Sequence, residues 1–382
     1  MQKKFIALAI ASLSGAAFAQ SNVTVYGVVD GTFDIINTSG AAGAGRGAPD
    51  YTRVQSNGSR LGFKGTESLG NGMSAFFQFE SNAKFDAGGG LDVARDSFVG
   101  LKGDFGTVKL GNFSGPNRDI ASKLDVVIHS DGIGDNSALL GKLGGRASVF
   151  DTRYTNSIAY ITPDFSGFQA TVQYQANENK NIAPSANPAN QSLAELGLNY
   201  DNGPVYVGLT HGKLTEKNST GAGTFNTGTD EDVTETRLGG MYKFGNASVR
   251  ALFAHTKGDG SLGSLKQNVW GLAGTYMVTA NGKLLAQYFR ANDLSGNRAG
   301  VTDLSDTGAK FWVLGYEHSL SKRTTLLAHY AYLKNDDRVS AVSGMAKGYD
   351  FGDGSTGIAG SAGSNNDGLK LSGLQVGINH TF

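Results

Sequence analysis

The sequence contains no cysteine, which excludes disulfide scaffolds, thiolate-bound metals, iron–sulfur clusters and thiol nucleophiles. Its 33 Lys and Arg balance its 33 Asp and Glu, so the chain lacks the basic excess that displaces counterions from nucleic acid. After the first 20 residues it also lacks any apolar run of about 18 residues, the length of a membrane-spanning helix. We therefore expect no nucleic-acid partner, no metal and no cofactor.

The first nineteen residues have the three-part order of an export signal. Two lysines precede an apolar stretch from Phe5 to Leu13, and Ala17-Phe18-Ala19 places small residues where signal peptidase reads the chain. We predict residues 1–19 as a cleaved signal peptide and residues 20–382 as the mature domain. The mature protein is then expected beyond the inner membrane.

The mature chain is rich in glycine, with 56 in the full sequence, and alternates between apolar and polar residues. Near its start the apolar set is Val23, Val25 and Val29, and the last strand repeats the pattern up to the final residue. Alternation of this kind marks strands with unlike faces. The runs extend over about ten residues, which is longer than usual in globular proteins and typical of strands that cross a bilayer.

Sixteen such runs are joined by alternating short and long connections. The runs begin near Val23, Arg60, Met73, Arg95, Thr107, Ser157, Phe168, Leu193, Val205, Thr234, Ala247, Asn268, Lys283, Lys310, Thr324 and Lys370. This pattern predicts an all-β fold, a 16-stranded antiparallel transmembrane barrel with short periplasmic turns and long external loops. A soluble β-sandwich would show strands of about half this length, and a β-helix would show a repeated motif.

A barrel of sixteen strands leaves a continuous aqueous channel. The sequence has no Gly-x-Ser-x-Gly elbow, no His-Glu-x-x-His and no Walker-A loop, so we expect no enzyme activity. The acidic run 131–136 lacks the spacing of a calcium loop, which favours a simple turn. Geometry and charge are thus predicted to determine function without catalysis.

Residues 113–150 form the most informative connection. They combine acidic, basic and apolar side chains, and a loop in free solvent has no use for the apolar cluster from Leu124 to Ile128. We predict that this segment is a constriction loop that folds into the barrel and narrows the channel. A loop extending outside the barrel is the alternative.

Several motifs together resemble the trimeric Gram-negative general porins, in their β-proteobacterial branch. They are Val25-Tyr26-Gly27-Val28-Val29-Asp30, Ser59-Arg60-Leu61-Gly62-Phe63-Lys64-Gly65-Thr66-Glu67, Phe105-Gly106-Thr107-Val108-Lys109-Leu110-Gly111 and the ending Val376-Gly377-Ile378-Asn379-His380-Thr381-Phe382. The resemblance implies a sixteen-stranded barrel, a homotrimer and a third loop folded inward. It also implies that the terminal Phe382 is read by the outer-membrane insertion machinery.

In such porins arginines on the wall face acids on the folded loop. The resemblance assigns the basic wall to Arg60, Arg95 and Arg153, and alternation places Arg60 and Lys64 on the inward face. On the loop it points to the acids Asp125, Asp131 and Asp135. Asp96 has the opposite parity to Arg95 and is expected to face lipid or a neighbouring subunit.

These features predict passive diffusion of small hydrophilic solutes and ions, with a preference for anions if the basic wall outweighs the loop acids. A substrate-specific channel for an anionic nutrient is one alternative, and a barrel that acts mainly as an adhesin or surface receptor is another. Outer-membrane lipid, lipopolysaccharide and the insertion machinery are the other expected partners.

Overall fold

A computed structural model describes residues 22–40, 50–88, 91–147, 149–176, 190–217, 230–339, 348–351 and 366–382. The predicted signal peptide, residues 1–19, lies outside the described residues. The strands that build the barrel are β1 (Asn22–Ser39), β3 (Arg60–Gly70), β4 (Met73–Asn82), β5 (Ser97–Gly103), β6 (Gly106–Ser114), β9 (Arg153–Ile161), β10 (Phe168–Gln175), β11 (Asn190–Asn202), β12 (Val205–Lys217), β13 (Glu231–Phe244), β14 (Ala247–Gly260), β15 (Gly263–Met277), β16 (Gly282–Ala291), β18 (Ala309–Ser319), β19 (Thr324–Asn335) and β20 (Lys370–Thr381).

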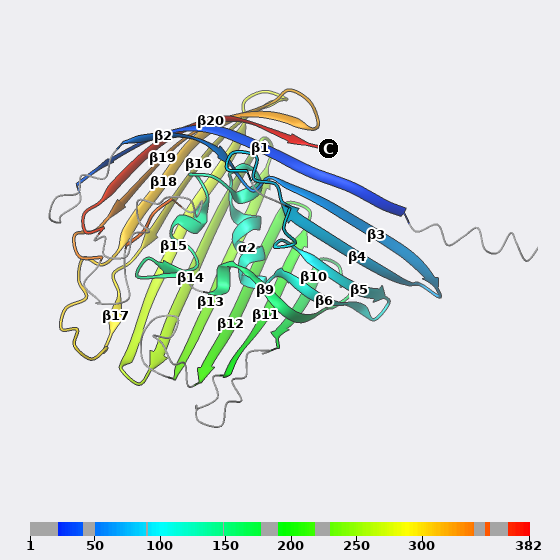
Figure 1. Cartoon of the computed structure of the whole chain (residues 1–382), viewed down its shortest axis with the longest axis horizontal. Coiled ribbons are helices and arrows are strands. Elements are labelled where there is room, and N and C mark those ends of the chain that lie inside the picture. The colour runs from blue at the N-terminus through cyan, green and yellow to red at the C-terminus, as the bar shows by residue number, and fades with distance from the viewer. Residues whose placement is uncertain are drawn as a thin grey trace, which may run out of the picture.

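These strands form one closed antiparallel barrel, which confirms the predicted fold (Figure 1). Closure comes from the first and last strands, which pair from Val28 opposite Thr381 to Ser39 opposite Lys370. Each of the sixteen predicted strand starts lies within one of these strands or two residues before it. A closed sheet leaves no unpaired edge, which a lipid environment requires.

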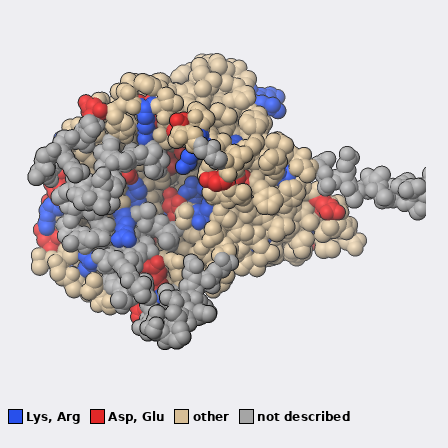
Figure 2. All heavy atoms as spheres, viewed as in Figure 1, with Lys and Arg blue, Asp and Glu red and all other residues tan. Residues whose placement is uncertain are grey.

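The two faces of the wall differ as the alternation predicts. On the outer face Val25 is 54% exposed and Leu272 is 58% exposed, whereas the inward Asp34 is fully buried. Figure 2 shows the same contrast, because charged side chains gather over the hollow middle of this face and the flank at the right is largely uncharged. The apolar exterior suits hydrocarbon, and the polar interior suits water.

Short additional strands lie at the long-loop end and in the inner segment. They are β2 (Tyr51–Ser56), which pairs with β1, β17 (Ser295–Gly296), which pairs with β15, and the small hairpin of β7 (Lys142–Leu143) and β8 (Arg146–Ala147). The alternation pattern did not predict them. In the described part of the chain, no helix has the length and apolar character needed to cross a membrane.

The predicted constriction loop lies inside the barrel, as Figure 1 shows for its helix α2 (Pro116–Leu124). Pro116 occupies the first helical turn, where its missing N–H costs nothing, and Lys123 lies in the last turn. Three single-turn 3₁₀ helices follow: η2 (Ile128–Ser130), η3 (Asn136–Ala138) and η4 (Val149–Asp151).

Glycines in the wall make room for helix α2. A Cβ at Gly208 of β12 would lie 2.8 Å from Ile120 Cδ1, and one at Gly239 of β13 would lie 2.3 Å from Leu124 Cδ1. Apolar residues of the loop and of the wall thus form one buried cluster, which includes Ile120, Leu124, Ile133, Leu139, Phe311 and Leu371. The loop is therefore packed against the barrel as a core element.

Candidate functional site

Arginines and one glutamate gather on the inner wall beside the folded loop. Arg60 begins β3, and Arg95 stands two residues before β5. Glu80 of β4 lies between them, with its carboxylate 3.7 Å from Arg60 Nε and 2.6 Å from Arg95 Nε. Tyr26 of β1 donates its hydroxyl proton to the same carboxylate over 3.0 Å. One acid is therefore shared by two cations and a phenol.

Arg153, at the start of β9, pairs with the carboxylate of Asp96. The expectation that Asp96 faces lipid or a neighbouring subunit is therefore wrong. The strand alternation was extended one residue too far, because β5 begins only at Ser97 and Asp96 lies in the bend before it. Side chains in a bend do not follow the inward and outward alternation of a strand, so Asp96 can point inward to Arg153.

The loop adds a fourth arginine to this region. Arg118 of α2 donates to the Asp151 carbonyl over 2.5 Å and lies close enough to Arg153 for the two guanidinium charges to interact. We refer to Arg60, Arg95, Arg118 and Arg153 as the arginine cluster.

Asp131 is the predicted loop acid that lies against the arginine cluster. Its carboxylate packs on Gly58, where an added Cβ would come within 1.8 Å of Oδ2, and the Gly58 carbonyl accepts a hydrogen bond from Arg60. Burial raises the pKa of Asp131 above its ordinary value, and the charges of Arg95, Arg60 and Arg118 act against that rise. Asp131 thus faces three members of the cluster.

Asp125 and Asp135 have a different setting, because their carboxylates are bonded to loop backbone away from the arginine cluster. The Asp125 carboxylate accepts the N–H groups of Val127 and Asn136, each over 2.9 Å, and Asp135 accepts the Ser137 N–H over 2.8 Å. Burial raises the pKa of both carboxyls. In the structure they hold the loop in shape and do not contact the arginine cluster.

His129 is a loop residue that sequence analysis did not single out. Its Nδ1 lies 3.5 Å from Arg60 Nη2, and its Nε2 lies 3.3 Å from Asn379 Oδ1 of β20. Burial and the Arg60 charge lower the pKa of His129. These contacts fit a neutral ring that accepts from the arginine at Nδ1 and donates to the asparagine from Nε2.

The loop is tied to the wall at two places. Arg237 of β13, which is fully buried, pairs with Glu235 at 2.5 Å and Asp151 at 3.2 Å and donates to the Asn117 carbonyl over 2.7 Å. The Ile128 N–H donates to Glu317 of β18 over 3.1 Å. Because β14, β15 and β16 lie between these two strands, the segment runs along this part of the inner wall.

Charge in this constriction is unequal. The arginine cluster contributes four positive charges, and Glu80, Asp96 and Asp131, which pair with it or face it, contribute three negative charges. Asp119 of α2 also interacts with Arg118 and Arg153, but Lys109 of β6 acts on it more strongly than either arginine, so this pair adds one charge of each sign. The net charge of the constriction, counted over these residues, is 5 − 4 = +1. Lys64 lies on the same face of β3, with Nζ 4.9 Å from the centre of the Tyr26 ring, and is a further cation outside this count. Facing charges in a narrow passage set up a transverse field with a positive surplus.

Three of the residues that matter here carried a signal that the sequence analysis did not use. The inward parity of β4 includes Glu80, and the inward parity of β13 includes Glu235 and Arg237. The positions of Arg118 and His129 carry no such signal, because they depend on the path of the loop.

The predicted assembly residue Phe382 lies at the seam of the barrel. Its N–H donates to the Gly27 carbonyl over 3.1 Å, and the Gly27 N–H donates back to its carbonyl over 3.2 Å. The ring covers Gly27, where a Cβ would come within 2.4 Å of ring atom Cζ. The last residue therefore pairs with the first strand, β1, at the seam.

Comparisons with known proteins agree with this architecture. The model of the Gram-negative porin family matches residues 6–338. Outer membrane porin protein 32 of Delftia acidovorans is 34% identical over 386 residues, which covers 100% of both chains. An outer membrane porin protein of Bordetella pertussis is 30% identical and covers 88% of this chain and 95% of its own.

Solved structures match over nearly the whole chain. The anion-selective porin from Comamonas acidovorans has a TM-score of 0.75 with 29% identity and covers 95% of this chain and all of its own. The trimer form of OmpT of Vibrio cholerae has a TM-score of 0.65 with 18% identity and covers 95% of this chain and 99% of its own, a likeness of fold.

Proposed function

This chain belongs to the Gram-negative porin family, and on that premise we propose that it is an anion-preferring general diffusion porin whose selectivity is set by the arginine cluster. The barrel forms a water-filled passage through the outer membrane, and small hydrophilic solutes and ions cross it without catalysis. The preference for anions is the part of this function that depends on the site.

The positive surplus in the constriction carries the proposal. Arginine stays protonated at any working pH, so the surplus persists where the loop narrows the lumen. A passing anion lowers its electrostatic energy there, and a passing cation raises it. The similarity to an anion-selective porin supports the same sign of preference.

Three partners belong to this proposal. A homotrimer is supported by family membership and by the likeness to a porin solved in a trimer form. Outer-membrane lipid, including lipopolysaccharide, would surround the apolar exterior. The insertion machinery would read Phe382 before its backbone closes the seam with Gly27.

The test is ion selectivity in planar bilayers under a salt gradient. Replacing both Arg60→Ser and Arg95→Ser changes the constriction from +1 to −1, so the reversal potential should move toward cation selectivity and the conductance should rise. Arg323→Ser, at the exposed short turn between β18 and β19, is the matched control and should leave both unchanged.

An unchanged reversal potential in the double variant would refute the assignment of the constriction. Saturable block of the current by one organic anion would instead favour a substrate-specific channel.

A further inference from the structure

Four neighbouring strands each carry one cation at the same level of the sheet, near the long-loop end. Arg290 of β16 stands opposite Lys310 of β18, Lys310 opposite Lys334 of β19, and Lys334 opposite Lys370 of β20. We refer to these four residues as the basic row.

The basic row lies on the outside of the barrel. The residues that flank it in these strands, such as Phe289, Phe311, Leu333 and Leu371, are all buried and face inward. Because successive residues of a strand alternate between faces, the four cations face the surroundings of the barrel. They are therefore separate from the arginine cluster in the lumen.

Such a row is costly without a counter-charge. Side chains directly opposite each other on paired strands have their Cβ atoms about 5 Å apart, and like charges in that position destabilise the sheet. Arg290 is balanced by Asp336, with 2.7 Å between the charged atoms. Among the residues that the structure describes, no ion pair involves Lys310, Lys334 or Lys370.

A second outward set of lysines shows how the barrel neutralises such charges elsewhere. On β12 to β14, Lys213 pairs with Asp232 at 2.9 Å and Lys257 pairs with Asp259 at 2.6 Å. The contrast shows that the basic row carries positive charge that the described residues do not neutralise.

Aromatic side chains mark the depth of the row in the membrane. A row of aromatic residues lies two positions from the basic row, toward the short-turn end of the same strands. In it Tyr288 stands opposite Trp312 and Trp312 stands opposite Tyr332. The rings of Trp312 and Tyr332 stack with their centroids 5.6 Å apart. Tyr and Trp collect at the boundary between hydrocarbon and headgroups. The basic row therefore lies at the level of the lipid headgroups on the outer side.

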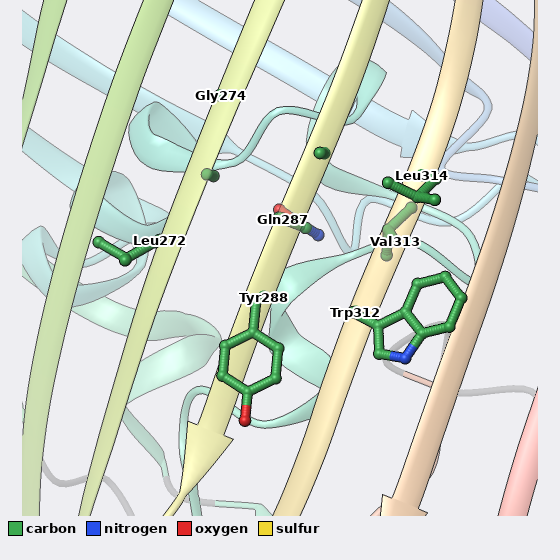
Figure 3. Close-up of a pocket in the computed structure, with 9 residues that line it drawn as sticks. Leu272, Gly274, Gln287, Tyr288, Trp312, Val313 and Leu314 are labelled. Atoms are coloured by element: carbon green, nitrogen blue, oxygen red, sulfur yellow. The ribbon is translucent and has the colours of Figure 1, made fainter.

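A groove continues from the aromatic residues toward the middle of the membrane. It has a volume of about 580 Å³ and is floored by the small residues Gly274 and Ala286, with Leu272 and Leu314 beside them. Figure 3 shows Tyr288 and Trp312 on neighbouring strands at the loop-end side of this groove. A furrow with an apolar lining in contact with hydrocarbon fits an acyl chain.

We propose that the basic row binds the phosphate groups of a phosphorylated glycolipid of the outer leaflet, and that one acyl chain of the lipid lies in the groove of Gly274 and Ala286. Three features favour this occupant: unbalanced positive charge at headgroup depth, aromatic side chains at the boundary, and an apolar furrow beneath them. Phosphate oxygens accept several charge-assisted hydrogen bonds and neutralise adjacent lysines together. The proposal rests on the proposed function for the membrane in which the barrel lies.

The experiment is native mass spectrometry of the detergent-solubilised porin titrated with lipid A that carries two phosphates. We expect a saturable bound lipid for the wild type and at least tenfold weaker binding for the triple variant Lys310→Gln, Lys334→Gln and Lys370→Gln. A triple variant with Arg at the three positions should bind like the wild type.

Three controls separate the possible results. The matched control has Gln at the outward lysines Lys213 and Lys257 and at the exposed Lys266 of β15, which stands opposite Lys257, and it should keep its affinity within about twofold. Dephosphorylated lipid A should bind the wild type as weakly as the Gln variant. Ala286→Trp, which fills the groove, should weaken binding while the basic row is intact. Heat-modifiable migration on gels shows that each variant is folded.

Equal affinity of the wild type and the Gln variant would overturn the proposal. Complete displacement of the lipid by an equal concentration of inorganic phosphate would also overturn it, because that result would identify a site for the free anion. Loss of the trimer in the Gln variant would overturn it as well, because that result would identify an interface between copies. Lipid binding is measured without current, and selectivity is measured in bilayers without lipid A, so either proposal can fail alone.

Discussion

Replacing Glu80 by glutamine should make the channel more anion-selective, a change opposite in sign to that of the arginine variants. Glu80 is the carboxylate shared by Arg60 and Arg95. Glutamine keeps its size and still accepts the Tyr26 hydroxyl proton, but it removes one negative charge. The net charge of the constriction then rises from +1 to +2.

The size of the effect follows from the Coulomb energy of one added charge. At about 6 Å from a permeating ion in water, a unit charge contributes about 0.7 kcal/mol, which screening at 0.15 M salt reduces to about 0.3 kcal/mol. An anion gains this energy and a cation loses it, so the permeability ratio should change about threefold. The low-dielectric wall makes this a lower bound.

Reversal potentials in planar bilayers at 0.1 and 1 M salt test this reasoning, and the shift should shrink at the higher concentration. Glu67→Gln, on the exposed face of β3 near the short-turn end, is the matched control and should leave the ratio unchanged. A ratio that stays constant in Glu80→Gln, or that shifts toward cations, would refute the view that net charge in the constriction sets selectivity.

Two further predictions follow from the loop. Because burial raises the pKa of Asp131, its negative charge should be lost on acidification at a pH above the ordinary carboxyl value of about 3.9, so anion selectivity should rise as pH falls. Reversal potentials between pH 4 and 8 check this, and Asp131→Asn should flatten the profile; an equally steep profile in that variant would contradict it. Gly239→Val would place side-chain atoms against Leu124 and force α2 away from the wall into the lumen. The single-channel conductance should therefore fall. A conductance equal to that of the wild type would contradict the packing of α2 on the wall.

The barrel could be predicted from the sequence because each strand separates lipid from water. Apolar and polar residues alternate through that wall, so the pattern gives both the strands and the inward side of Arg60 and Lys64. The rule ends where the strand ends. Asp96 lies one residue before β5, in a bend where side chains do not alternate regularly between the two faces, and it points inward to Arg153.

The path of the loop could not be predicted in the same way. Asp125, Asp131 and Asp135 look alike in the sequence, and all three accept backbone N–H groups, but only Asp131 also faces the arginines. The difference arises from local turns and from packing on the distant wall. Loop segments are fixed by such tertiary contacts, for which a single sequence has no periodic signal.

The attachment of the inner segment along the wall has a mechanical consequence. A cylinder with water inside has no packed centre to resist flattening by lateral pressure from the bilayer. The segment from α2 to η2 is attached to β13 through Arg237 and to β18 through Glu317, and it lies against the strands between them as an inner brace. The element that narrows the aperture therefore also stiffens this part of the shell, so pore size and shell stiffness cannot be altered independently.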